Sequence, residues 1–430
     1  MSTVKKVLSS SAVPILFTVI CIIGILLSGT PLSTILADVV NRFDRNFLLV
    51  LSLIIPVICG LGMNFGIVLG AMCGQLGLVV VKILNISGMP AILVAAAIAF
   101  AAAIVCGNLA GRLLNHAKGQ EMITSMILGY FSNGIYQFIF LFIIGGVIKV
   151  SSDIILQGGV GIKNTIDLSD IQYALDDFKI AGFGGRMELF SGIQFFSVLF
   201  FAYYGFAAFR NKNKRSLVKA IGCAAVFVAA YFLSMMPQFA VARMLIRIPV
   251  PTLLFDIFIC WLLTRFIQTK MGQDMRAIGH DREVSLSAGI NVDKTRITAV
   301  VISTVLAAWG QIIFYQNLGT MDAYYGHEKV GTFCVAAILI GGASVKKASI
   351  SQAVLGTVLF HLLYNVSPLA SQHLFHDSTV GGYFRLALCY GVIAIALMIH
   401  VWDSEKQSKA LQEATDRKVG PAESIKQTEE

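Results

Sequence analysis

The chain has 430 residues, of which 56% are hydrophobic and 13% are charged, and its mean hydropathy is +0.77. Soluble globular chains carry about 25% charged residues, so this composition excludes a soluble enzyme or binding domain and predicts an all-α polytopic membrane protein. The net charge of +9 reflects lysines and arginines that gather in loops on one side of the expected membrane, as the positive-inside rule describes, and not a nucleic-acid-binding surface.

The first part of the chain predicts one span and a connector. Lys5 and Lys6 precede the apolar run 13–27, which predicts a retained first helix with its N-terminus in the cytoplasm. The same pattern also fits a signal peptide, but the many later apolar runs favour a retained helix. Residues 30–46, which carry Arg42 and Arg45, are expected to form an external connector.

The next apolar run, 47–81, is too long for a single span of about 20 residues. Glycines at 60 and 62, next to Asn64, predict a break in this helix, which a membrane tolerates only where the backbone faces protein or a water-filled cavity. The segment is therefore expected to line a translocation path, with Asn64 and Gln75 offering hydrogen bonds. The alternative is that the glycines serve helix packing and the amides bond to neighbouring helices.

Two sets of glycines predict close helix packing. Gly66, Gly70 and Gly74 recur every four residues, and Gly107 and Gly111 follow the alanine-rich span 89–106. A helix face without side chains lets another backbone approach closely. We therefore expect both helices to pack tightly against their neighbours.

The run 122–148 leads back across the membrane and carries polar side chains. Tyr130, Asn133 and Gln137 combine an aromatic ring with amides, which can stack on and hydrogen-bond to a flat polar ring. They are candidate path residues, although interfacial anchoring and core packing explain each of them singly. Glu121, at the start of this helix, is expected to act as a cap that interacts favourably with the helix dipole.

The segment 150–192 is a polar insert between spans and is expected outside the membrane. Ile171, Ala174, Leu175 and Phe178 have the spacing of a short amphipathic helix. The insert has two possible roles, contact with a substrate-delivery protein or simple coverage of the membrane domain. Further spans are expected at 193–209, 221–236 and 252–266.

A polar stretch of mixed charge, 272–290, interrupts the apolar C-terminal half and reads GQDMRAIGHDREVSLSAGI. Its charged residues cannot lie in hydrocarbon, where each costs roughly 2.5 kcal/mol or more. The segment 267–296 is therefore expected in water, on the cytoplasmic side. Gly272 and Gly289 lie near its ends and Gly279 lies in the middle, which predicts a short helix, a break at Gly279 and a second short helix.

This stretch resembles the cytoplasmic coupling loop of bacterial ABC-importer permeases for simple sugars, nucleosides and branched-chain amino acids. The residues that carry the resemblance are Gly272, Arg276, Ala277, Gly279, Ala288, Gly289 and Ile290. A second stretch, EMITSMILGYF at 121–131, is similar to the nucleoside and simple-sugar members. The resemblance covers residues 48–400.

The resemblance implies a permease domain over residues 1–401, with ten to twelve transmembrane segments, in the bacterial cytoplasmic membrane and with both termini in the cytoplasm. It implies three partners: a separate ABC ATPase, a second permease subunit, identical or related, and an extracytoplasmic solute-binding protein. The sequence contains no GxxxxGK[ST] phosphate-binding loop, so ATP would be used by the partner and this chain would bind no cofactor. The coupling residues would receive the motion of the ATPase, and the solute is expected to be a neutral ring compound such as a nucleoside or a simple sugar.

Two other functions remain open. Asp256 lies within the span 252–266, and a membrane carboxylate is a functional candidate, so it favours an ion-gradient-driven secondary transporter. Arg247 and Arg265 are its candidate partners, and a local polar contact is the favoured explanation of Asp256. A channel or a structural membrane protein is the third possibility, which no motif supports. The eight cysteines lie in apolar runs without a CxxC or Cys/His cluster, so no metal site is expected.

The last part of the chain adds spans at 297–315, 350–364 and 383–400. Relatives usually carry a glycine-rich loop where this chain reads GGASVKK at 341–347, so Lys346 and Lys347 are a departure from the family pattern. Residues 402–430 form a charged tail that is expected to be cytoplasmic and partly disordered.

Overall fold

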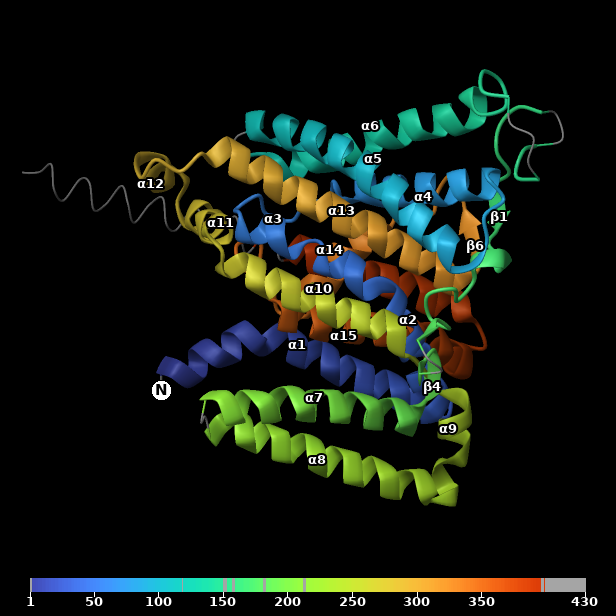
Figure 1. Ribbon diagram of the computed structural model, residues 1–430, viewed down its shortest axis with the longest axis vertical. Coiled ribbons are helices and arrows are strands. Elements are labelled where there is room, and N and C mark those ends of the chain that lie inside the picture. The colour runs from blue at the N-terminus through green and yellow to red at the C-terminus, as the bar shows by residue number, and fades with distance from the viewer. Residues whose placement is uncertain are drawn as a thin grey trace, which may run out of the picture.

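The computed structural model describes residues 2–395 and residue 398, apart from 118, 150–152, 157–158, 181–182 and 212–213. In this part of the chain, eight helices are long and apolar enough to cross a membrane, and three shorter apolar helices accompany them. Most of them run between two ends of the molecule, one marked by α11 and α12 and the other by the β-strands (Figure 1). The predicted all-α polytopic fold is confirmed, since a helix satisfies its own backbone polar groups in hydrocarbon. The predicted tail at 402–430 lies outside the described residues.

The long helices are α5 (Gly88–His116), α6 (Glu121–Phe138) with its π-helical extension η1 (Ile139–Ile143), α7 (Leu189–Asn211), α8 (Lys214–Met235), α10 (Val250–Gln268), α13 (Val292–Leu318) and α15 (Ile350–Phe375). The eighth covers Ser378–Ile395. Shorter apolar stretches lie in α1 (Ser2–Leu27), α4 (Ile67–Ile83) and α14 (Val330–Ile340). Together they make eleven apolar helices among the described residues, of which eight are long enough to span a membrane, so the expected ten to twelve transmembrane segments stay a prediction.

α13 is the most buried of the long helices and packs against α2, α4 and α5. A Cβ atom on Gly70 or Gly74 of α4 would lie 2.4 Å from a backbone oxygen of α13. A Cβ atom on Gly107 or Gly111 of α5 would lie 2.9 Å from a Cα atom of α13. The close packing predicted from these glycines is confirmed. Gly66 differs, because it precedes α4 and its nearest neighbour is the side chain of residue 64.

The predicted break in the second apolar run is confirmed. α2 (Leu32–Leu51) is followed by the short α3 (Ile54–Ile58), then by a largely irregular stretch, 59–66, and then by α4. We call 59–66 the first break. Gly60 and Gly62 have φ angles of +73° and +71°, which residues with a Cβ atom rarely adopt. The connector predicted for 30–46 is wrong, because residues 32–46 begin α2 and Asp44 among them is fully buried.

A second non-helical stretch, 341–349, joins α14 to α15, and we call it the second break. Gly342 has a φ angle of +87°, and Ser344 and Lys347 form an isolated antiparallel bridge in which Ser344 N donates to Lys347 O at 2.8 Å. A Cβ atom on Gly62 would lie 3.3 Å from Val345 Cγ1. The two breaks therefore lie against each other.

The opposite end of the molecule carries three short antiparallel strand pairs. β1 (Thr165–Asp167) pairs with β6 (Thr320–Asp322), β2 (Lys179–Ile180) with β3 (Phe183–Gly184), and β4 (Arg186–Glu188) with β5 (Arg247–Pro249). The amphipathic helix predicted at 171–178 is wrong. The chain forms a 3-10 helix, η2 (Ser169–Ile171), and then turns, because Tyr173 has a φ angle of +56° that a right-handed helix excludes.

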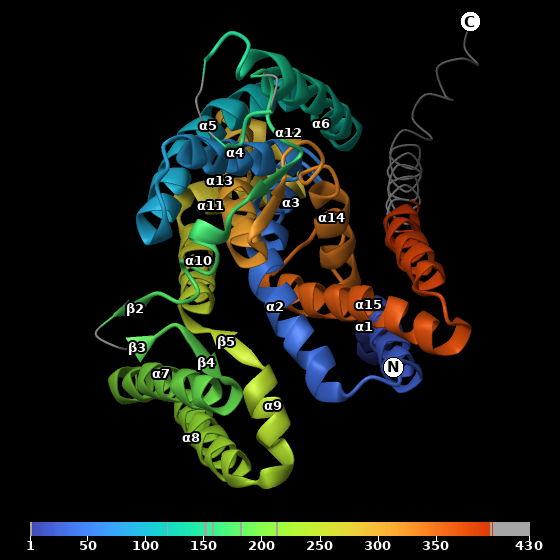
Figure 2. The same cartoon turned by 90° about the vertical axis from the view of Figure 1, so that its right-hand side faces the viewer.

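α7 and α8 pack against each other as a hairpin at the edge of the molecule (Figure 2). The hairpin is joined to the bundle at the strand end, through β4 and β5 and through η3 (Pro237–Phe239) and α9 (Ala240–Leu245). Only 11% of the most apolar part of each helix is buried, so most of the hairpin is available to lipid.

Candidate functional site: a water-facing helix pair and a polar network

The polar stretch 272–290 folds as two short helices, α11 (Lys270–His280) and α12 (Arg282–Ser287). Thr269 Oγ1 accepts a hydrogen bond from Gly272 N at 3.4 Å. Asp281 Oδ1 accepts bonds from two backbone N–H groups of α12 at 2.9 and 3.0 Å. Both residues thus act as N-caps. The predicted pattern of two short helices is confirmed, but the break lies at Asp281 and not at Gly279.

Gly279 instead lies where α11 packs against the end of α3. A Cβ atom at this position would lie 2.1 Å from Ile58 O at the end of α3, and one on Gly60 would lie 2.9 Å from the Cα atom of Gly279. Real Cβ atoms do not approach other atoms this closely, so both glycines are required for the contact. α11 therefore touches the first break backbone to backbone, and a displacement of α11 reaches the broken helix directly.

The other predicted coupling residues differ in exposure. Arg276, Ala288 and Gly289 are exposed, Ala277 and Ile290 are half-buried, and Gly272 is buried. Val284 and Leu286 of α12, which the sequence analysis did not single out, are 65% and 54% exposed. Both side chains are therefore left uncovered by the rest of the described chain.

A buried ion pair connects the start of α13 to the start of α6. Arg296 Nη2 donates to Glu121 Oε1 at 2.5 Å, and the two side chains are 2% and 15% exposed. Glu121 lies in the first turn of α6, where the helix dipole favours an acid as expected, but the hydrogen bond of its side chain is to Arg296 and not to a backbone N–H group of the helix. Burying Arg296 requires this partner, since an unpaired buried charge is strongly unfavourable.

Three of the five predicted path residues belong to one hydrogen-bond network inside the bundle. Gln75 Nε2 donates to Tyr315 Oη at 2.9 Å and to the backbone oxygen of Asp322 at 3.1 Å. Gln75 Oε1 lies 2.7 Å from Nδ1 of His327. On the other side of this ring, His327 Nε2 lies 2.8 Å from Asn133 Oδ1.

The network continues to the surface of α6. Asn133 Nδ2 donates to Glu328 Oε1 at 2.7 Å, and Gln137 Nε2 donates to Asn133 Oδ1 at 3.3 Å. A small cavity of about 60 Å³ lies beside it and is lined by Phe65, Val68, Met126, Gly129, Tyr130, Asn133, Glu328, Gly331 and Thr332. α4, α6 and the start of α14 thus bring amides, a carboxylate and aromatic rings together at one place.

Two residues of this network, His327 and Glu328, were not predicted from the sequence. His327 joins Gln75 to Asn133, and Glu328 accepts a hydrogen bond from Asn133. Their only signal was a histidine and an acid placed between two apolar runs. His327 lies in the turn between β6 and α14 and is fully buried. Burial lowers the pKa of His327 to about 4, so the ring is neutral at pH 7 and donates one hydrogen bond only.

The two remaining path candidates lie in different surroundings. Tyr130 is 71% exposed and lines the small cavity. Asn64 is buried, and its Oδ1 accepts a hydrogen bond from Gly66 N at 2.9 Å. Asn64 therefore holds the first break in shape, and a contact between Asn64 and a solute stays a prediction.

Buried carboxylates gather near the strand end. Asp176 of the insert is fully buried; it accepts a hydrogen bond from Thr252, one from Gln316 Nε2 at 2.8 Å and one from Asn317 Nδ2 at 3.1 Å. Asn317 Nδ2 also donates to Asp44 Oδ2 at 3.3 Å. These bonds fasten the insert to α10 and α13.

Asp256 lies in α10 with 2% of its surface exposed, and neither of its carboxylate oxygens accepts a hydrogen bond from the described residues. The partnership with Arg247 or Arg265 predicted from the sequence is wrong, because no ion pair joins Asp256 to any described residue. A buried carboxylate without a partner is unfavourable as an ion. The charge of Asp256 therefore does not stabilise the packing of α10.

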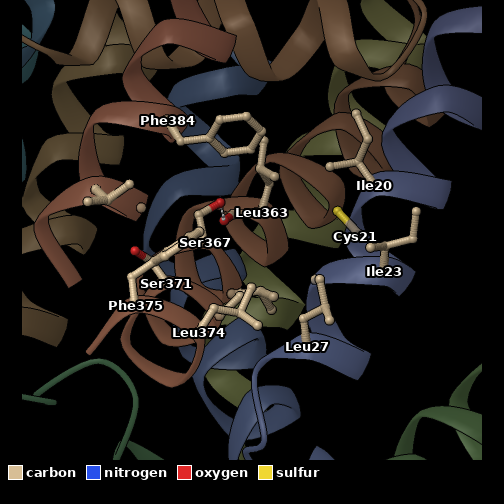
Figure 3. A pocket seen from close by; sticks show the side chains of 15 residues that line it. Ile20, Cys21, Ile23, Leu27, Leu363, Ser367, Ser371, Leu374, Phe375 and Phe384 are labelled. Carbon is tan, nitrogen blue, oxygen red and sulfur yellow. Dashed lines mark hydrogen bonds between the residues drawn. The ribbon is translucent and has the colours of Figure 1, made fainter. Parts of the chain in front are cut away.

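A different pocket, of about 360 Å³, lies between α1, α15 and the helix Ser378–Ile395 (Figure 3). Its lining is apolar apart from Ser367 and Ser371, whose hydroxyls donate to the backbone oxygens of Leu363 and Asp377 at 2.8 and 2.6 Å. Because these hydroxyls already donate to the backbone, the pocket suits lipid chains and not a polar solute.

Among the described residues, eight helices long enough to span a membrane, two helix breaks in contact and a polar network inside the bundle define a polytopic membrane protein. Residues 35–402 match the family described as "Branched-chain amino acid transport system / permease component". The chain belongs to this family. The resemblance inferred from the stretch 272–290 is thereby confirmed.

Curated proteins that resemble parts of this chain are named as transport permeases. The chain is 32% identical over 102 residues to the tyrosine transport system permease protein of Clostridioides difficile (strain R20291), which covers 23% of this chain and 34% of that protein. It is 26% identical over 161 residues to the xylose transport system permease protein XylH of Haemophilus influenzae, covering 37% and 40%, and 27% identical over 124 residues to XylH of Escherichia coli K12, covering 27% and 30%. The chain thus spans well under half of each relative. No solved structure matches it.

Proposed function

We propose that this chain is the membrane-spanning subunit of an ATP-driven importer in the bacterial cytoplasmic membrane, and that a separate ATPase supplies the energy. The observation that carries the proposal is the contact between Gly279 of α11 and the end of α3 at the first break. It joins a helix pair that cannot lie in hydrocarbon to a broken helix that can line a path.

The transport step follows from this contact. An ATPase bound to α11 and α12 pushes α11 against residues 58–60, and the first break and α4 shift with it. α4 carries Gln75 of the polar network, so the shift rearranges the groups that face a solute. Two arrangements of packed helices, one open to each side, are the usual basis of alternating access.

The proposed path runs along α4, α6 and the start of α14. The cavity beside Tyr130 and Asn133 is about 60 Å³, which is too small for a sugar or a nucleoside, while Tyr130 is 71% exposed on the outside of the chain. A second permease subunit, identical or related, is proposed to complete the path at this face. Amides, a carboxylate and aromatic rings favour a neutral ring compound with several hydroxyls or amides, such as a simple sugar or a nucleoside.

In this proposal α11, α12 and both termini lie in the cytoplasm, and the strand end, with the insert 150–192, faces a solute-binding protein. ATP is bound by the partner and not by this chain. A cysteine introduced at Ser287, an exposed position of α12, tests the orientation. An impermeant maleimide is expected to label it in opened cells only; labelling of intact cells would contradict the proposal.

The decisive experiment is reconstitution. The full chain is extracted in mild detergent with its ATPase, placed in liposomes with the binding protein, and assayed for uptake of sugars and nucleosides with and without ATP. Uptake that requires ATP and the ATPase supports the proposal. Uptake driven by a proton or sodium gradient alone would overturn it.

That second outcome defines the alternative function, a secondary transporter. One observation favours it: the carboxylate of Asp256 is buried in α10 without a partner among the described residues, as a proton-carrying group in a membrane often is. The two functions differ in their requirement for Asp256.

A further inference from the structure

A polar pocket of about 710 Å³ opens between α11 and the second break, beside the end of α3. Its charged lining comes from two elements: Arg276 and His280 of α11, and Lys346 and Lys347 of the second break. No carboxylate is among the described residues that line it. The sequence analysis assigned Arg276 to coupling but gave no role to the other three.

The pocket gathers positive charge from segments that lie far apart in the chain. Arg276 and Lys347 form no ion pair with any described residue, and both are exposed. Like charges that converge on one cavity repel each other, and the arrangement becomes favourable when an anionic group enters. The chemistry of the pocket therefore fits carboxylates or phosphates.

The surroundings point to a protein as the source of these anions. The pocket adjoins α11, and the exposed apolar Val284 and Leu286 follow on α12. Exposed apolar and charged side chains on neighbouring helices are both available to a protein partner. A free inorganic anion would also contact only a small part of a pocket of about 710 Å³, whereas a peptide segment can reach both charged walls.

We infer that this pocket receives an acidic segment of the partner ATPase, whose carboxylates pair with Arg276 on one wall and with Lys347 on the other. The inference rests on the proposed function and adds a second contact to it. An ATPase held this way grips α11 and the second break together. Since the second break lies against the first, through Val345 and Gly62, both broken helices would follow one movement of the ATPase.

A zero-length cross-link tests the contact in the unaltered complex. A water-soluble carbodiimide joins a lysine amine to a carboxylate only when the two are in contact. In the complex of the full chain with its ATPase, we expect mass spectrometry to find Lys346 or Lys347 joined to an aspartate or glutamate of the ATPase. Cross-links from other lysines of the chain to the ATPase, with none from these two, would overturn the inference.

Charge reversal gives an independent test, in which Lys347→Glu is compared with Lys347→Arg and with Lys214→Glu. Lys214 is exposed at the start of α8, remote from the pocket in sequence and fold, and is a matched control for charge. We expect Lys347→Glu to lower the amount of co-purified ATPase about tenfold, because a like charge inside an interface is strongly unfavourable. The other two variants are expected to retain it.

The outcomes separate the inference from the proposed function. If the wild-type chain retains no ATPase, the proposed function fails. If it retains the ATPase and Lys347→Glu retains it equally, only the inference fails. If Lys347→Glu instead loses bound phosphatidylglycerol in nanodiscs of known composition, with ATPase binding unchanged, the pocket serves lipid headgroups and the inference is overturned.

Discussion

Gly60 and Gly279 lie in backbone contact, although one belongs to a break between apolar helices and the other to a short polar helix. A Cβ atom on Gly60 would lie 2.9 Å from the Cα atom of Gly279, and one on Gly279 would lie 2.1 Å from Ile58 O. No side chain separates the two elements, so little flexible material can absorb a movement of α11 before it reaches the first break.

The first prediction is that Gly279→Ala uncouples transport. The added methyl group forces α11 away from α3, and overpacking of this kind typically costs 1–3 kcal/mol. We expect uptake in proteoliposomes to fall about tenfold or more, while the binding protein still captures the solute. Gly222→Ala is the control, because a Cβ atom there meets nothing within 4 Å. Unchanged uptake by Gly279→Ala would remove the basis of the proposed coupling.

The second prediction concerns the ion pair of Arg296 and Glu121, which are 2% and 15% exposed. Glu121→Gln leaves the guanidinium buried without a counter-charge, and breaking such a pair costs about 3–5 kcal/mol. The thermal unfolding temperature in detergent is expected to fall clearly. Arg296→Met combined with Glu121→Gln should recover part of the loss, and a double variant less stable than both single variants would show that the pair is not the cause.

The fold was largely predictable because hydrocarbon restricts the choices. Long apolar runs must be helices there, and Gly60 and Gly62 predicted the first break because their φ angles, +73° and +71°, are accessible mainly to glycine. The helix at 171–178 was predicted wrongly because apolar spacing says nothing about Tyr173, whose φ of +56° is imposed by the tertiary structure. Tyr173 N donates to Gln316 O of α13 at 2.8 Å, a contact no local pattern contains.

The candidate site was predictable only in part, for the same reason. Gln75, Asn133 and Gln137 were recognised singly, as amides in apolar runs. That His327 joins Gln75 to Asn133 depends on how α4, α6 and the turn before α14 meet, because Gln75 and His327 are 252 positions apart in the sequence. Glu121 was assigned a cap because dipole arguments are local, whereas its partner Arg296 is 175 residues away.

The third prediction is a pH effect on stability through His327. Burial lowers its pKa from 6.5 to about 4, so the unfolded chain takes up a proton at a higher pH than the folded chain. The free energy of unfolding is therefore unaffected by His327 above pH 6.5. It decreases as the pH drops towards 4, by up to about 3 kcal/mol. The unfolding temperature measured between pH 7 and pH 4.5 should fall more steeply for the wild type than for His327→Gln.

His116→Gln is the control for this experiment, since His116 is exposed at the end of α5. It should keep the pH dependence of the wild type. Equal slopes for the wild type and His327→Gln would mean that His327 does not contribute the effect.

The fourth prediction separates the two transport functions. Asp256→Asn removes a buried charge without changing the shape of the side chain, so the unfolding temperature is expected to stay equal or to rise. ATP-driven uptake should remain within about twofold of the wild type. Loss of uptake with unchanged stability and ATPase binding would instead favour a proton-carrying role for Asp256.

The last prediction concerns the bonds that hold the insert. Asp176→Ala removes the acceptor of three buried hydrogen bonds and leaves Thr252, Gln316 and Asn317 with unsatisfied donors, at about 1–3 kcal/mol for each group. The insert should then be cleaved by added protease much faster than in the wild type, at sites within 150–192. Asp170→Ala breaks an ion pair of the same insert, with Lys82 at 2.7 Å, but Asp170 is 56% exposed, and exposed pairs contribute only about 0–1 kcal/mol. Asp170→Ala should therefore be cleaved at the rate of the wild type. If Asp176→Ala and Asp170→Ala are cleaved equally fast, the buried bonds of Asp176 are not what holds the insert in place.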